Sequence, residues 1–185
     1  MTPWIIFVCL FPLVHLVFSW PNMPPTKETE PKLLYEPSAP DYRSSAQPQS
    51  LFDKLAPDTS LSTFMDVLTQ VDSIFALFNN SQIDQPFTVF APTNAAFRRG
   101  MDAEAKHDLE RFLRSHIVPS GVLDPEALRK ADELNTMLKD ETIAVKHHFL
   151  SRKTVLNGEA VVDTDQPIRA ANGIAYRIDH VLRHA

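Results

Sequence analysis

Proline is concentrated in one part of this chain, and that concentration limits where a compact domain can form. Eight of the 15 prolines fall between residues 21 and 57, where charged and small polar residues fill much of the remaining sequence. Proline fixes φ and lacks a backbone donor, and the few apolar side chains there cannot offset the entropy lost on ordering. The sequence therefore predicts a flexible, Pro-rich spacer over residues 20–57 and a folded domain over residues 58–185.

The N-terminal segment is almost wholly apolar from residue 4 to residue 20, with the sequence WIIFVCLFPLVHLVFSW. An export signal has an apolar core of about 7–15 residues, followed by small residues at the cleavage site. Val17 and Ser19 fit the two small-residue positions, so we predict a signal peptide over residues 1–19, cleaved between Ser19 and Trp20. An uncleaved anchor and a buried helix are the alternatives. No second apolar span follows in the sequence, which predicts no membrane span after signal removal.

Charge and cysteine content narrow the classes of function. The formal net charge is -5 and the sequence pI is about 5.8. Such a chain has no overall attraction to nucleic acid or to anionic lipid, although a local basic patch is compatible with it. The single cysteine, Cys9, lies in the predicted signal peptide, so the mature chain would hold no thiol for a disulfide, a metal site or a nucleophile. We expect no nucleic-acid partner and a domain stabilised by its apolar core.

The apolar pattern changes along the folded part. Apolar residues recur at helical spacing from Leu61 to Val71, and shorter helical patterns follow at residues 74–78, 103–113 and from Asp124. After a β-rich run at residues 87–91, the later pattern predicts short strands at residues 117–118, 135–138, 142–147, 154–156, 160–163 and 173–178. Because helices concentrate early and strands late, the predicted fold class is α+β rather than an alternating parallel sheet.

Three segments together resemble the signature blocks of fasciclin-like domains. They are FTVFAPTNAAF at residues 87–97, SHIVP at residues 115–119 and NGIAYRIDHVL at residues 172–182. Their order and spacing extend the resemblance over about residues 50–184, and LNG at residues 156–158 also fits. Within the blocks, eight positions are interpreted as structural: Phe90, Pro92, Thr93, Asn94, Phe97, Asn172, Gly173 and Asp179.

The resemblance implies a β-wedge or sandwich of short strands with helices packed around it. It also implies residence outside the cell, in a cell wall or in an endomembrane lumen, and a role in adhesion or matrix contact. Two departures from the family pattern bear on function. Ser115 precedes His116 where integrin-binding members often have Tyr-His, and Tyr176 and Arg177 occupy a stretch that often holds a histidine. Integrin binding is therefore not carried over to this chain.

His116 is the most conspicuous candidate for chemistry in the sequence. It is interpreted either as a partner contact or acid–base group, or as a structural histidine whose ring nitrogens bond to backbone; we favour the structural interpretation. His147 and His148 are adjacent on a predicted strand, so their side chains would point to opposite faces and could not readily share a metal ion.

Other catalytic patterns are weak. Asp179 and His180 could form a triad with Ser120 or Ser151, but the sequence has no G-x-S-x-G elbow. The arginines between residues 98 and 114 could bind an acidic partner or a sulfated glycan, but interleaved acidic residues favour an ordinary mixed-charge face. We therefore predict no enzyme activity, no metal and no cofactor.

The leading functional prediction is a non-enzymatic interaction or adhesion-type module, either secreted or held in a vacuole-like lumen. Its partner would be an unknown protein or glycan at a cell surface, matrix or wall. Asn79 begins the sequon Asn79-Asn80-Ser81 and is the candidate glycosylation site. The alternatives are a carrier of an apolar ligand in a pocket between helices and sheet, and an unrecognised hydrolase.

Overall fold

The computed structural model describes residues 48–101 and 103–183. The predicted signal peptide, the cleavage pair Ser19 and Trp20, and most of the predicted spacer lie outside the described residues. The helices are α1 (Leu51–Leu55), the 3-10 helix η2 (Thr59–Leu61), α2 (Ser62–Leu68), α3 (Asp72–Asn79), α4 (Asn94–Arg99), α5 (Ala103–His107), α6 (Leu109–Ser115) and α7 (Pro125–Lys130). The strands are β1 (Phe87–Pro92), β2 (Ile117–Val118), β3 (Glu133–Asn135), β4 (Thr142–His148), β5 (Lys153–Leu156), β6 (Ala160–Val162), β7 (Ile168–Ala170) and β8 (Gly173–Ile178).

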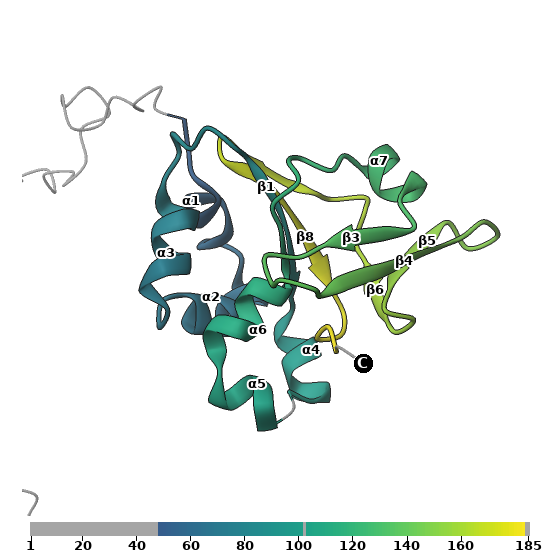
Figure 1. Ribbon diagram of the computed structural model, residues 1–185, viewed down its shortest axis with the longest axis horizontal. Helices are drawn as coiled ribbons and strands as arrows, with labels where there is room; N and C mark the ends of the chain where they lie inside the picture. The colour runs from purple at the N-terminus through teal and green to yellow at the C-terminus, as the bar shows by residue number, and fades with distance from the viewer. Residues whose placement is uncertain (1–47, 102, 184–185) are drawn as a thin grey trace, which may run out of the picture. The chain divides into compact units, whose positions relative to one another are not determined.

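One mixed sheet forms the centre of the domain. Its strand order is β2-β1-β8-β6-β5-β4-β3, and β7 pairs with β8 beside this path. Neighbouring strands of the described chain pair antiparallel, except that β1 and β8 run in parallel from Phe87 opposite Gly173 to Pro92 opposite Ile178. The first and last strands of the described chain are therefore neighbours, which brings the opening and closing sequence blocks side by side (Figure 1).

The sheet separates two apolar clusters. The first contains Phe87, Val89 and Ala91 of β1 with side chains of α1, α2, α3 and α6, so it fills the space between helices and sheet. The second contains Phe90 of β1 and residues of β3 to β6, β8 and α7, so it lies on the other side of the central strands. In Figure 1, α1 to α3 lie to the left of β1 and β8, α4 to α6 lie below them, and β3 to β6 with α7 lie to the right. The predicted α+β wedge with helices around it is confirmed.

Helix α1 corrects the boundary predicted at residue 58. The side chain of Ser50 accepts from Asp53 N–H at 3.2 Å, and Asp53 Oδ2 accepts from Ser50 N–H at 3.0 Å, which makes a reciprocal capping box. Leu51 and Leu55 are both 0% exposed. The prolines around this segment led to the prediction of a spacer, whereas the structure has a short capped helix that packs into the core. The folded part therefore begins before residue 58.

Two other predicted elements differ from the structure, and one observed strand was not predicted. The helix predicted over residues 103–113 is two helices, because the Asp108 side chain accepts from Arg111 N–H and begins α6 as a new helix. The strand predicted over residues 135–138 ends at Asn135, because the N–H and hydroxyl of Thr136 both donate to the Glu141 carbonyl and close a turn. The sequence did not predict β7, because this strand has only three residues and none of them is buried.

Candidate functional site

Asn172 lies in the turn between β7 and β8 and is fully buried. Its Oδ1 accepts from Leu51 N–H at 2.7 Å, and its Nδ2 donates to the carbonyls of Leu77 at 3.2 Å and Phe78 at 2.9 Å. The Asn172 carbonyl accepts from Phe87 N–H at 3.1 Å. One side chain therefore joins α1 and α3 to the sheet.

Gly173 begins β8 and lies opposite Phe87 of β1. Its φ is +159°, and a Cβ built there would collide with the carbonyl oxygen of Phe87 and lie 3.1 Å from Cδ1 of Leu51. A glycine is needed at this position because of the close approach of the neighbouring backbone.

The block from Phe90 to Phe97 has the same structural character. Thr93 caps α4 by accepting from Ala96 N–H at 3.3 Å. Asn94 accepts from Thr63 N–H at 2.9 Å and donates to the Thr59 carbonyl at 2.9 Å, which ties α4 to η2 and α2. The buried backbone groups at these helix ends are thereby satisfied.

Aromatic rings complete the two core clusters. Phe90 stacks on Tyr176 at a centroid separation of 6.0 Å, and Phe97 packs on Phe112 at 5.9 Å. The Tyr176 hydroxyl donates to the Leu123 carbonyl at 2.6 Å. Burial raises the pKa of Tyr176 to about 12, so this hydroxyl stays a hydrogen-bond donor at neutral pH.

His116 is buried with 0% exposure at the end of α6. Its Nδ1 lies 2.8 Å from the Phe112 carbonyl, and its Nε2 accepts from Leu182 N–H at 3.2 Å. Ser115 is also buried, at 3% exposure. The Ser115–His116 pair therefore offers no exposed surface to a partner, and His116 links the central segment to the closing block.

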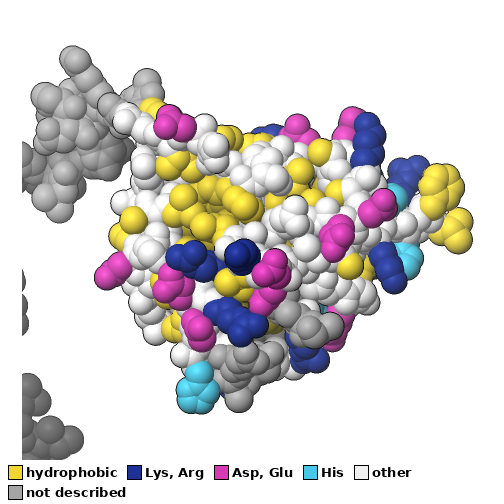
Figure 2. Space-filling model, viewed as in Figure 1, with side chains coloured by type: hydrophobic (Ala, Val, Ile, Leu, Met, Phe, Trp, Pro, Cys, Tyr) yellow, Lys and Arg dark blue, Asp and Glu magenta, His cyan; other side chains and the backbone are white. Residues whose placement is uncertain are grey.

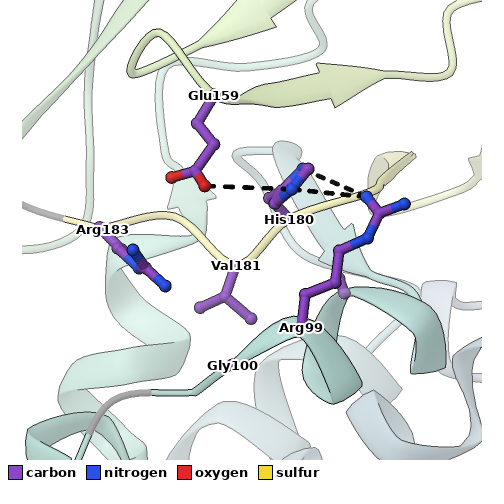
Figure 3. A pocket seen from close by; sticks show the side chains of 7 residues that line it. Arg99, Gly100, Glu159, His180, Val181 and Arg183 are labelled. Atoms are coloured by element: carbon purple, nitrogen blue, oxygen red, sulfur yellow. Dashed lines mark hydrogen bonds and ion pairs between the residues drawn. The ribbon is translucent and has the colours of Figure 1, made fainter.

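A pocket lined by charged side chains lies beside the closing block. Its volume is about 170 Å³, and Figure 3 shows the side chains of Arg99, Glu159, His180 and Arg183 around it. Arg99 comes from the end of α4, Glu159 from the β5–β6 turn, and the other two from the segment after β8.

Arg99 and His180 are held in place by their neighbours. Nη1 of Arg99 donates to the Asp179 carbonyl at 3.0 Å and lies 3.4 Å from both ring nitrogens of His180, so the guanidinium lies against the imidazole ring. His180 Nδ1 lies 2.9 Å from Asp179 Oδ1, and Nε2 lies 3.9 Å from Glu159 Oε1. Both imidazole nitrogens therefore face a carboxylate.

Asp179 is the carboxylate that contacts both Arg99 and His180. Burial raises the pKa of Asp179, but the hydrogen bonds from His180 and from Val161 N–H, together with the positive charge of Arg99, outweigh burial and hold the pKa below its usual value. Asp179 is therefore ionised at neutral pH and orients His180. It also closes the end of β8 by accepting from Val161 N–H at 2.7 Å.

The weak triad pattern of Asp179 and His180 with Ser120 or Ser151 is not assembled. Ser120 and Ser151 neither line the pocket nor hydrogen-bond to His180, and the lining residues include no serine, cysteine or threonine. Within residues 48–101 and 103–183, no group of three or more His, Cys, Asp or Glu side chains could hold a metal ion, and His147 and His148 belong to no such group. The pocket lining presents two guanidinium groups, one imidazole and one carboxylate, and no hydroxyl or thiol.

The arginines between residues 98 and 114 are a mixed-charge face. Arg111 pairs with Glu141 at 2.7 Å, and Arg114 pairs with Glu110 at 2.7 Å one helical turn away. Arg98 and Arg183 differ from these two, because neither guanidinium has a described carboxylate within ion-pair distance. This difference was not visible in the sequence, which gives no signal for which arginines acquire partners.

Three further predictions concern surfaces. Asn79 is exposed at the end of α3, where its side chain is accessible. The space between helices and sheet, where the carrier alternative placed its pocket, is filled by fully buried side chains such as Phe64 and Phe78. No helix in the described part of the chain is long and apolar enough to cross a membrane.

Comparison with known proteins supports the sequence resemblance. A family profile described as Fasciclin domain matches residues 59–184. A solved structure of a FAS1 domain pair from the insect cell adhesion molecule fasciclin I matches with a TM-score of 0.57 and 18% sequence identity. The match covers 73% of this chain and 51% of that structure, so the chain spans about half its length. A comparison with curated proteins finds no match.

Proposed function

This chain belongs to the fasciclin domain family, and from that premise we propose that it is a non-enzymatic, adhesion-type module that binds a protein or glycan through its surface. We place it in the secretory pathway, either secreted or in a vacuole-like lumen, behind a signal peptide at residues 1–19 that is cleaved before Trp20. The polar pocket beside His180 is its candidate contact for an acidic group of the partner.

The geometry of the pocket is the observation that carries this proposal. Arg99 and Arg183 supply guanidinium groups from two different segments, which suits the recognition of a carboxylate or a sulfate. His180 is turned toward Asp179 and Glu159, and no nucleophile is within its reach. Binding without turnover is therefore the chemistry that the described side chains support.

The motif residues support the same proposal in a different way. Asn94, Asn172 and His116 use their polar atoms to join elements of the fold. Residues with such roles identify an architecture and leave the function to the surface. Side chains outside the family blocks or at their exposed ends would then bind the partner. Arg183, which directly follows the closing block, is one of them.

Binding is tested with the full chain immobilised on a surface and challenged with neutral, carboxylated and sulfated glycans and with matrix proteins. We expect one anionic class to bind, and Arg183→Glu to weaken that binding by about tenfold, because an attractive charge becomes repulsive. Arg129→Glu on α7 is the matched control, since it makes the same charge change at another exposed site. Equal effects of the two substitutions would contradict the pocket assignment.

Residence is tested by the intact mass of the protein from its own host, before and after treatment with N-glycosidase. We expect a chain that begins at Trp20 and loses mass on treatment, with Asn79→Gln abolishing the shift. A full-length, unmodified chain would contradict the secretory proposal.

A further inference from the structure

The tip of the β4–β5 hairpin carries the most exposed large apolar side chains in the described structure. Phe149 is 87% exposed and Leu150 is 98% exposed, whereas Val122, the third exposed large apolar residue, is 40% exposed. Both belong to the turn between His148 and Lys153, which face each other at the end of the strand ladder. Figure 2 shows a hydrophobic patch at the outer edge of the molecule in this region.

The hairpin is anchored at its base and free at its tip. Ile143, Val145 and Leu156 are buried in the second core cluster, and Thr154 is fully buried. From Lys146 to Lys153 every residue is exposed. Figure 1 shows this hairpin projecting beyond the rest of the domain. The core therefore anchors the base of the hairpin, and the tip is open to solvent.

The charge around the tip is opposite in sign to that of the whole chain. The segment from residue 142 to residue 156 contains Lys146, Arg152, Lys153 and two histidines, but no aspartate or glutamate, in a chain of net charge -5. Figure 2 shows Lys or Arg and His side chains gathered around the hydrophobic patch. Lys146, Arg152 and Lys153 form a cationic collar around the apolar tip. This arrangement fits an interface that is anionic at its surface and apolar immediately beneath.

We propose that the β4–β5 tip is a membrane-contact site, which inserts Phe149 and Leu150 into the interface of a bilayer that carries anionic headgroups. The cationic collar would lie at headgroup level, where each Lys or Arg is attracted by the negative surface potential. The two apolar side chains would leave water for the acyl boundary. A bilayer offers both environments over the few ångströms that separate the collar from the tip.

The opposing charge of the rest of the molecule restricts the contact to this one projection. A protein of net charge -5 is repelled as a whole by an anionic surface, so only a local cationic feature that extends from the body can approach it. A second copy of this chain would also have to accommodate the tip, and two side chains bury far less than the roughly 1,000 Å² that a stable protein contact needs. A lipid surface requires no such area.

The test is co-sedimentation of the full chain with vesicles of phosphatidylcholine alone, and with vesicles of phosphatidylcholine and phosphatidylserine in equal parts. We expect stronger partition to the mixed vesicles, falling as salt rises. The double substitution Phe149→Ser with Leu150→Ser should lower the partition roughly tenfold or more, because the transfer of both side chains from water is lost. Arg152→Glu with Lys153→Glu should lower it by a similar factor.

Two controls isolate the tip. Arg129→Glu with Lys130→Glu makes the same charge change on α7, and Val122→Ser removes an exposed apolar side chain elsewhere; both should partition like the unmodified chain. All variants keep the same N-terminal segment, so any contribution of residues 4–20 is common to all. Arg183→Glu, which tests the partner pocket, should leave vesicle binding unchanged, so the two proposals fail independently.

Three results would overturn the proposal. The first is unchanged partition of the tip variants, and the second is equal loss in the α7 control. The third is a chain that ignores vesicles but self-associates in light scattering through Phe149 and Leu150, which would assign the tip to a second copy.

Discussion

At the scale of single residues, buried polar side chains join segments that are distant in the sequence. Thr88 on β1 donates to the Gly121 carbonyl at 2.7 Å and accepts from Leu123 N–H at 2.9 Å, which fixes the loop before α7. Asn172 does the same for α1 and α3. Buried groups of this kind are costly to leave unpaired, so each is a point where a single substitution is felt by several elements.

Replacing Asn172 with alanine tests this role. The change would leave Leu51 N–H and the carbonyls of Leu77 and Phe78 without their partner. We expect a loss of about 3 kcal/mol in the free energy of unfolding, measured by urea denaturation. Asn80→Ala removes an exposed asparagine whose Oδ1 accepts from Gln82 N–H, and it should cost much less. A similar loss in both variants would contradict the bridging role.

Replacing Gly173 with alanine tests the close approach of β8 to β1. The added Cβ would overlap the carbonyl oxygen of Phe87, so backbone must move. We expect destabilisation of more than about 2 kcal/mol from this overpacking. Gly121→Ala is the control, because its φ of +103° is also strained but no atom lies within 4 Å of the new Cβ. Its cost should be about 1 kcal/mol, from backbone strain alone.

At the scale of elements, short helices are stabilised by caps and by the sheet more than by their length. Helix α1 has only five residues, but its capping box and two fully buried leucines hold it against the core. Isolated helices of this length are not stable in water, so α1 exists because β7, β8 and α3 provide its contacts.

Chains that begin at residue 46 and at residue 58 test whether α1 is part of the domain. The shorter chain lacks Leu51 and Leu55 of the first core cluster. The loss of each buried leucine should lower the free energy of unfolding by several kcal/mol. We expect the longer chain to unfold cooperatively in urea and the shorter one to unfold at much lower urea or to lack a cooperative transition. Equal midpoints would show that α1 is dispensable and that the domain begins where the sequence pattern placed it.

At the scale of the whole molecule, a partly buried ion pair connects the helical side to the central strand. Arg177 on β8 donates from Nε and Nη2 to Oδ2 of Asp58, at 2.7 Å and 2.6 Å, and Asp58 caps η2. Burial raises the pKa of Asp58, but the hydrogen bonds from Ser60 and Arg177 outweigh it and hold the pKa below its usual value.

The lowered pKa values of Asp58 and Asp179 predict acid sensitivity. A carboxylate whose pKa is lower in the folded state contributes stability above its unfolded pKa of about 4, and that contribution is lost as the pH falls through the folded value. We expect Asp58→Asn to cost about 1–3 kcal/mol at neutral pH, and the difference from the unmodified chain to shrink toward about pH 3. Urea denaturation over a pH series measures it. Asp165→Asn, at an exposed turn, should show no such pH-dependent difference.

The fold class and most of the elements could be predicted from the amino-acid sequence. Apolar periodicity located the helix around residues 62–68 and the strands β1, β4, β5 and β8, because the side-chain period of an element is a local property of the sequence. The three signature blocks indicated the family correctly. The structural interpretation of His116 also came from the sequence and stays a prediction.

Only the tertiary structure decided which side chains meet. The parallel pairing of β1 with β8, the bridge from Asn172 to α1 and α3, and the pocket between Arg99, His180 and Arg183 all join residues far apart in the chain. Exposure also depends on packing: Phe149 and Leu150 resemble core residues in the sequence, and their place at the end of a projecting hairpin leaves them in water. Local patterns record what each segment prefers, whereas contacts and exposure follow from how the segments are packed against each other.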